Sequence, residues 1–205
     1  MSANLCEKLL TGCINADCNN PVFQGVDAVA YIFNKSEVDS LTYDQTNPNL
    51  VTAIVMKTHE VDNSDITYTG YKINQLGKTP YTGTTTTMTE GNIFNRYTSE
   101  FHFVVPDNSP TAANLIDALK DGKFMVVIKN EYEGTDGQGT YQIYGGKKGL
   151  VASAIEGAKY SDDTEGGWAI TLTEEGSPVS ALFLEHKTGT DVDTEEYLEG
   201  LVDCE

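Results

Sequence analysis

The chain is poor in cations. Arg96 is its only arginine, and 13 basic residues stand against 31 acidic ones, which gives a formal net charge of −18 over 205 residues. Binding to a nucleic-acid backbone depends on lysine and arginine side chains that neutralise phosphates. The composition therefore argues against direct DNA or RNA binding. The acidity has two interpretations: simple solubility, or a surface that must not adhere to a polyanion.

Long apolar runs are also missing. No stretch approaches the roughly 20 residues that a membrane-spanning helix needs, so we predict no membrane span. Leu10–Cys13 resembles a lipoprotein cleavage box, but the preceding segment contains Glu7 and Lys8 and is far shorter than the about 7–15 apolar residues of a secretory signal. We expect no lipoprotein processing and interpret the chain as an unprocessed cytosolic product.

The four cysteines form no metal-binding pattern. Cys6, Cys13 and Cys18 contain no Cys-x-x-Cys spacing, and no histidine lies near them in the sequence. Unpaired thiols in a reducing compartment are the favoured interpretation. A bridge between Cys204 and the N-terminal cluster remains the alternative.

Catalytic constellations are absent from the sequence. The three histidines, His59, His102 and His186, are scattered in or near strand patterns, where we expect them to be cross-strand partners. The glycines between Gly134 and Gly139 separate two predicted strands, so they indicate a hairpin loop and not a phosphate-binding loop. We therefore expect no enzyme activity, no cofactor and no metal. Three acidic clusters lack the ligand spacing of a calcium-binding loop: 62–65, 162–165 and 191–196.

The clearest pattern in the sequence is a strand–helix–hairpin unit from Tyr97 to Gly145. Alternation predicts a strand that ends at Pro106. Ser109 and Pro110 are typical of a helix start, and Gly122 of its end. Two strands joined by the glycine loop follow. The predicted elements are a strand over 97–105, a helix over 110–121 with Ala112, Leu115, Ile116 and Leu119 as its apolar stripe, and strands over 124–132 and 140–144.

Further strands are predicted on both sides of this unit, so the expected fold class is mainly β: a sandwich or barrel flanked by one α-helix. Val26–Asn34 is apolar on both faces and should be buried on both. Ser36–Pro48 is polar and predicts a loop, and Leu150–Ile155 favours strand over helix. The remaining predicted elements are a short helix over 3–11, a polar turn over 15–21, and strands over 51–57, 66–73, 168–173 and 181–185.

The segment from Asn74 to Asn92 contains a run of four threonines and little that can pack into a core. It has two interpretations, a mobile surface loop or a long projecting hairpin that becomes ordered against a neighbouring subunit. On the second interpretation it supplies the candidate subunit contacts. These are Lys78, Thr79, Pro80, Tyr81, Thr84, Thr85, Thr86, Thr87 and Met88.

The C-terminal segment is strongly acidic. Asp191–Glu205 contains seven acidic residues and no basic one. A short helix with an apolar stripe is one interpretation, and a solvated tail is the preferred one. We predict a single domain over 1–205, with 1–20 as an N-terminal arm or helix and 188–205 as an acidic tail. The stripe consists of Tyr197, Leu198, Leu201 and Val202.

The central unit resembles tail structural proteins of tailed phages of Bacteroidota, including the crAss-like group. The similarity lies in Phe101–Val105, Pro110–Lys123 and Phe124–Gly145, and it extends through Asn19-Asn20, Gly25–Ala28 and Gly149-Leu150 to cover most of residues 14–186. It rests on strand and turn patterns, with no metal box or similar signature motif.

This resemblance implies a tail-tube-like fold whose copies assemble into a ring, with the sheets of neighbouring subunits continuing one another around a channel. It implies a virion protein of the tail tube, hub or connector, assembled in the host cytoplasm. Its partners would be copies of itself and other tail or portal-vertex proteins, and DNA would be only non-specific cargo in the channel. The alternative is a β-sandwich module that binds carbohydrate or a host surface.

Overall fold

The computed structural model describes residues 26–61, 64–74, 83–134, 137–162, 164 and 166–202. The predicted N-terminal helix over 3–11 and the turn over 15–21 lie outside this part of the chain. The elements are β1 (Val26–Asn34), β2 (Val38–Tyr43), β3 (Leu50–Met56), β4 (Thr58–Val61), β5 (Ser64–Thr67), β6 (Tyr71–Asn74), β7 (Gly83–Thr89), β8 (Arg96–Val105), α1 (Pro110–Leu119), β9 (Phe124–Asn130), β10 (Tyr141–Tyr144), β11 (Val151–Gly157), β12 (Trp168–Ser177), β13 (Leu182–Leu184), β14 (Lys187–Thr188), β15 (Asp191–Val192) and α2 (Thr194–Gly200).

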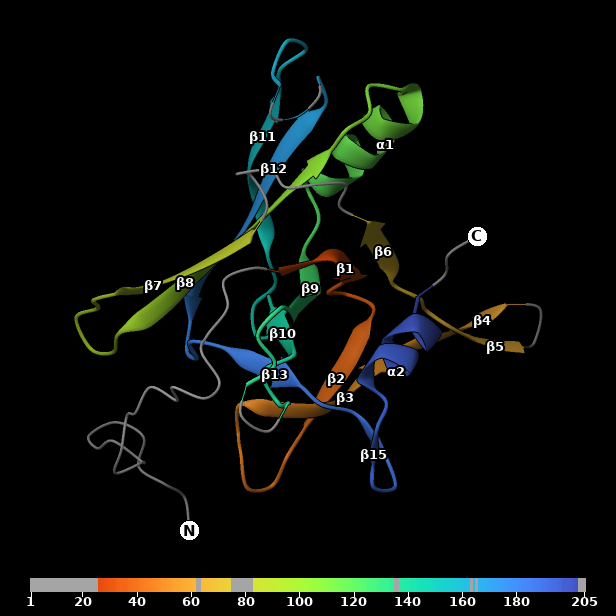
Figure 1. The fold of residues 1–205 in the computed structure, drawn as a ribbon, viewed down its shortest axis with the longest axis vertical. Coiled ribbons are helices and arrows are strands. Elements are labelled where there is room, and N and C mark those ends of the chain that lie inside the picture. The colour runs from red at the N-terminus through yellow and green to blue at the C-terminus, as the bar shows by residue number, and fades with distance from the viewer. Residues whose placement is uncertain are drawn as a thin grey trace.

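Two sheets dominate the structure (Figure 1). The larger one has seven strands in the order β2-β3-β13-β10-β9-β1-β6, and all its neighbours are antiparallel except β13 and β3. The smaller one is antiparallel and has four strands, β11-β12-β8-β7. The predicted fold class, mainly β with a flanking helix, is confirmed. The polar segment 36–48 contains strand β2, so the prediction of a loop there was wrong.

The strand–helix–hairpin unit is present, but it spans both sheets. Its first strand, β8, belongs to the four-stranded sheet, and its hairpin, β9–β10, belongs to the seven-stranded one. The helix between them starts as predicted, because the Ser109 hydroxyl accepts a hydrogen bond from the Ala112 N–H at 3.2 Å. Gly122 is required for packing, since a Cβ there would overlap the ring of Phe124. The unit therefore joins the two sheets.

Strand β1 is buried on both faces, as its sequence predicts. Ala30 and Ile32 face a core between the two sheets and α1, whereas Tyr31 and Phe33 face a second core on the opposite side of the seven-stranded sheet. Burying an apolar side chain of this size stabilises the fold by about 1.5–3 kcal/mol. The first core is completed by Phe101, Phe103, Ile116, Leu119, Phe124, Val126, Ile128, Tyr144, Leu150, Ile170 and Leu172.

The second core is covered by the C-terminal helix α2. Leu198 is fully buried there, and the Tyr197 hydroxyl both accepts from the Ile54 N–H at 2.8 Å and donates to the Ile54 carbonyl at 2.7 Å. Tyr197, Leu201 and Val202 pack against the same core. The preferred interpretation of this segment as a solvated tail was therefore wrong as far as residue 202. The alternative, a helix with an apolar stripe, is what forms.

Two glutamates on α2 fasten the helix to the sheet. Glu199 accepts hydrogen bonds from Lys72 at 2.6 Å and from the Tyr31 hydroxyl at 2.8 Å. The hydrogen bond from Lys72, followed by that from Tyr31, lowers the pKa of Glu199 below its ordinary value. Lys129 donates to the Glu195 carboxylate, with 2.9 Å between its Nζ and Oε2, and this hydrogen bond lowers the pKa of Glu195. The acids that suggested a tail thus help to hold the helix.

We predict that Leu198→Ala lowers the free energy of unfolding by about 2–5 kcal/mol, because it opens a cavity beneath α2. The exposed Glu196, on the same helix, supplies the matched control, and Glu196→Ala should change stability by no more than about 0.5 kcal/mol. Urea denaturation followed by circular dichroism measures both. Equal stability of the two variants would show that α2 does not cover the core.

The contacts of Glu199 also predict a pH dependence. Because its pKa is lower in the folded chain than its ordinary value of 4.5, the stabilisation is complete above that value and disappears as the pH falls through the folded-state pKa. Glu199→Gln should therefore be less stable than the wild type at pH 7 and lose less stability on acidification. Thermal melts from pH 7 to pH 3 test this, and parallel curves would contradict it.

Candidate subunit interface

The predicted contact residues fall into two groups. Lys78, Thr79, Pro80 and Tyr81 lie outside the described residues. The other five, Thr84, Thr85, Thr86, Thr87 and Met88, lie in β7. β7 pairs with β8 in one uninterrupted antiparallel register, from Gly83 opposite His102 to Thr89 opposite Arg96. The described part of the segment 74–92 is thus mainly one strand of a hairpin. Whether it becomes ordered against a neighbour stays a prediction.

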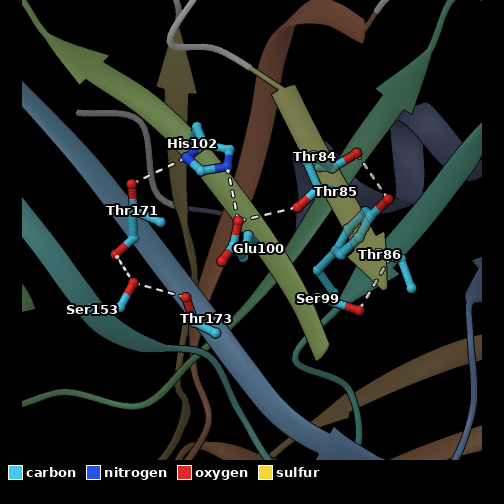
Figure 2. Close-up of polar contacts among 10 residues, drawn as sticks. Thr84, Thr85, Thr86, Ser99, Glu100, His102, Ser153, Thr171 and Thr173 are labelled. Carbon is cyan, nitrogen blue, oxygen red and sulfur yellow. Dashed lines mark hydrogen bonds and ion pairs between the residues drawn. The ribbon is translucent and has the colours of Figure 1, made fainter. Parts of the chain in front are cut away.

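Cross-strand polar contacts hold β7 to β8 (Figure 2). The Thr85 hydroxyl donates to the Glu100 carboxylate at 3.1 Å, on the face of the sheet that points away from the core. On the opposite face, the hydroxyls of Thr86 and Ser99 lie 3.3 Å apart. Such pairs are the unit of sheet stabilisation, each contributing roughly 0.2–1 kcal/mol. They explain why a threonine run forms a strand here.

Tyr144, on β10 of the other sheet, anchors the start of β7. Its buried hydroxyl donates to the Thr84 hydroxyl at 2.9 Å, so the contact bridges the two sheets. Burial raises the pKa of Tyr144, and the neighbouring threonine hydroxyls offset this only in part. Tyr144 therefore stays protonated and remains a donor. Beyond Thr84, the residues of β7 are exposed, and the β7–β8 hairpin extends away from the body of the protein (Figure 1).

The outer face of the four-stranded sheet carries a row of polar side chains. His102 contacts Thr171 on β12 at 3.0 Å and Glu100 at 3.5 Å. Further along, the hydroxyls of Ser153 and Thr173 lie 2.7 Å apart (Figure 2). The expectation that His102 is a cross-strand partner is confirmed, since it lies directly opposite Thr171. This face is rich in hydroxyls and contains few charges for such an acidic chain.

The other two histidines also have neighbours in the fold. His59 lies opposite Ile66 in the β4–β5 hairpin and packs on the Tyr68 ring, with 4.3 Å between ring centroids. His186 follows β13, stacks on Tyr197 at 3.9 Å and contacts the Thr52 carbonyl at 2.9 Å. The three histidines therefore lie on separate parts of the fold.

The free side of β7 lacks the features that usually protect an edge strand. No other described strand pairs with it, because β7 ends the order of its sheet. An edge strand normally avoids further pairing through charged side chains, proline or a bulge. Gly83–Thr89 contains no charge and no proline, and its register with β8 shows no shift. About half of its backbone N–H and C=O groups therefore face outward, where another strand can pair with them.

The tip of the hairpin exposes apolar side chains. Ile93 is 83% exposed, and Met88 and Phe94 are each 59% exposed. The guanidinium of Arg96 lies 5.9 Å from the centre of the Phe94 ring. Sequence reasoning missed Ile93 and Phe94 because it ended the segment of interest at Asn92. An apolar pair between the two polar residues Asn92 and Asn95 was the available signal.

No protein family, curated protein or solved structure matches this chain. In the described part of the chain, no helix is long and apolar enough to cross a membrane. The same residues contain no group of three His, Cys, Asp or Glu side chains placed to hold a metal ion.

We predict that Thr84→Val destabilises the protein by about 1–3 kcal/mol, because it removes the acceptor of the buried Tyr144 hydroxyl. Thr87→Val is the matched control, because Thr87 is exposed on the same strand, and it should stay within about 0.5 kcal/mol of the wild type. Equilibrium denaturation measures the difference. If both variants match the wild type, the contact with Tyr144 does not anchor β7.

Proposed function

We propose that the chain is a structural subunit of a phage tail, as a tube, hub or connector ring, and that its copies join by pairing the free edge of β7 with a strand of a neighbour. The observation that carries this proposal is the unprotected edge strand. A strand added to an open sheet edge gains backbone hydrogen bonds along its whole length. Such pairing continues a sheet from one subunit to the next, as the resemblance implies.

The shape of the hairpin supports the same proposal. Because the residues of β7 after Thr84 are exposed, the edge extends beyond the core that it helps to cover. A partner can therefore reach it without displacing another part of the subunit. The exposed apolar tip, with Ile93 and Phe94, adds surface that a neighbour can bury.

The charge of the chain suits a channel for DNA. A surface with a net charge of −18 repels a polyanion, so DNA would pass as non-specific cargo and would not adhere. On this proposal the protein is neither an enzyme nor a cofactor carrier. It acts in the virion tail, after assembly with copies of itself and with other tail or portal-vertex proteins.

The structure gives little support to the alternative, a module that binds carbohydrate. Among the described residues, the exposed aromatic side chains Tyr71, Phe94 and Tyr160 lie on separate elements and form no common platform. A cavity of about 620 Å³ is lined partly by β3 and by the segment that follows β13, and among its described lining residues His186 supplies the only aromatic ring. Because sugar rings pack on aromatic faces, we favour the ring subunit.

The free edge can be blocked by charge. Thr85→Lys with Thr87→Lys should leave the subunit folded and prevent ring formation, because lysines on an edge strand oppose further pairing. Thr111→Lys with Asn114→Lys is the matched control, since it adds the same charge at exposed positions of α1. Sedimentation velocity and negative-stain imaging measure assembly. An edge variant that assembles like the control would overturn the role of β7.

A further inference from the structure

Four of the 13 basic residues gather around one tight turn between β10 and β11. Lys147 and Lys148 lie in the turn and are exposed, whereas Lys35 and Lys123 flank Gly149, where an added Cβ would lie 3.3 Å from side-chain atoms of each. We call these four residues the lysine patch. In a chain with a net charge of −18, such a concentration of cations needs an explanation.

The backbone of the turn that carries Lys147 and Lys148 is held in a defined conformation. Gly145 and Gly149 both have positive φ angles, 74° and 88°, and both are buried. Reciprocal backbone hydrogen bonds between Phe124 and Leu150, at 2.9 and 2.7 Å, hold the end of the turn against the start of β9. These contacts therefore fix the position of the backbone from which Lys147 and Lys148 extend.

Three of the four ammonium groups of the patch contact neutral oxygens. Lys35 donates to the Gly146 carbonyl at 2.7 Å, Lys147 to the Tyr43 hydroxyl at 2.7 Å, and Lys148 to the Glu175 carbonyl at 2.5 Å. Within the described residues, none of the four lysines makes an ion pair with a carboxylate.

Two acidic residues contact Lys148 without pairing with its ammonium group through a carboxylate. Glu174 is buried beneath the turn and accepts from the Lys148 N–H, and the exposed Glu175 accepts from the Lys148 ammonium group through its backbone carbonyl. Burial lowers the pKa of Lys35 below its ordinary value. The negative charge of Glu174 acts against this decrease, and the positive charge of the nearby Lys147 adds to it. None of these contacts is an ion pair with an ammonium group of the patch, so the four lysines can accept an anionic partner.

A second feature of the same chain has the complementary charge. Strands β4 (Thr58–Val61) and β5 (Ser64–Thr67) pair as a separate two-stranded sheet that extends from the body of the protein (Figure 1). On it, Glu60 lies directly opposite Asp65, and both are exposed. Like charges in a cross-strand pair repel each other, and an isolated two-stranded hairpin is marginally stable at best. We call this hairpin the acidic arm.

We propose that the acidic arm of one copy docks on the lysine patch of the next. Contact with ammonium groups would relieve the repulsion between Glu60 and Asp65 and would give the lysines of the patch carboxylates to pair with. Because arm and patch are different surfaces, the contact joins copies head to tail, and such contacts form a ring when the rotation from one copy to the next closes. The inference rests on the proposed ring subunit and adds a second, electrostatic contact to the β7 edge.

Charge exchange between two variants tests this contact. Glu60→Lys with Asp65→Lys reverses the arm, and Lys147→Glu with Lys148→Glu reverses the patch. Each variant alone should associate at least tenfold more weakly than the wild type in sedimentation velocity at 50 mM NaCl. A 1:1 mixture should regain association, because each variant offers a complementary partner to the other. Raising NaCl to 500 mM should narrow the difference between the wild type and each single variant, because salt screens the charges by which they differ.

Two controls separate charge pairing from other effects. Glu131→Lys with Glu133→Lys changes the net charge by the same amount as the reversal of the arm, but at exposed residues outside it. This variant should assemble like the wild type. Circular dichroism checks folding, and the neutral pairs Glu60→Gln with Asp65→Asn and Lys147→Gln with Lys148→Gln replace any reversal that fails to fold. Each neutral pair should also weaken association.

The outcomes distinguish this contact from the ring proposal. A wild-type chain that stays monomeric at all concentrations overturns both. A wild-type chain that assembles, with arm and patch variants that assemble equally well, overturns only the docking of the arm. Weakened variants whose mixture stays monomeric show that arm and patch do not meet, and they overturn the inference as well.

Discussion

The centre of the seven-stranded sheet is buried on both faces, and the rest of the structure depends on this constraint. β1 and β9 alternate apolar side chains between two cores, so each face needs a separate cover. On one side the four-stranded sheet and α1 provide it, and on the other α2 does. A strand without polar faces cannot be exposed on either side without losing about 1.5–3 kcal/mol for each large side chain. Both covers are therefore obligatory parts of the fold.

The four-stranded sheet is larger than this covering role requires. Phe101 and Phe103 on β8 are fully buried or nearly so, but β8 begins at Arg96, and β7 pairs with it from Arg96 to His102. A projecting two-stranded edge adds little to the core and creates a risk of unwanted pairing. Short polar contacts such as Thr85 with Glu100 keep it ordered nonetheless. An ordered, unprotected edge is easiest to understand when pairing is its purpose.

Local signals in the sequence were sufficient for much of this fold. The capping hydroxyl of Ser109 and the two-faced apolar pattern of Val26–Asn34 each act within one element, so their outcome could be predicted. The candidate site could not be predicted in the same way, because only long-range pairing makes β7 an edge strand. The helix α2 was given only as the alternative to a solvated tail for a related reason. Its acids dominate the composition, yet one buried leucine, Leu198, and two ion-paired glutamates decide its structure.

Electrostatics limits how copies of such a chain can meet. Two subunits that each carry a net charge of −18 repel one another, so a stable contact must either avoid charge or match it. The free edge of β7 avoids charge, since its seven residues include no ionisable side chain. The lysine patch and the acidic arm match charge, and they differ in sign and position. Pairing at a neutral edge can set the hydrogen-bonding register between two copies. A complementary pair of charged surfaces sets the direction of assembly, because the arm of one copy contacts the patch of the next only when both copies have the same orientation. A chain with both kinds of surface has what directional assembly requires.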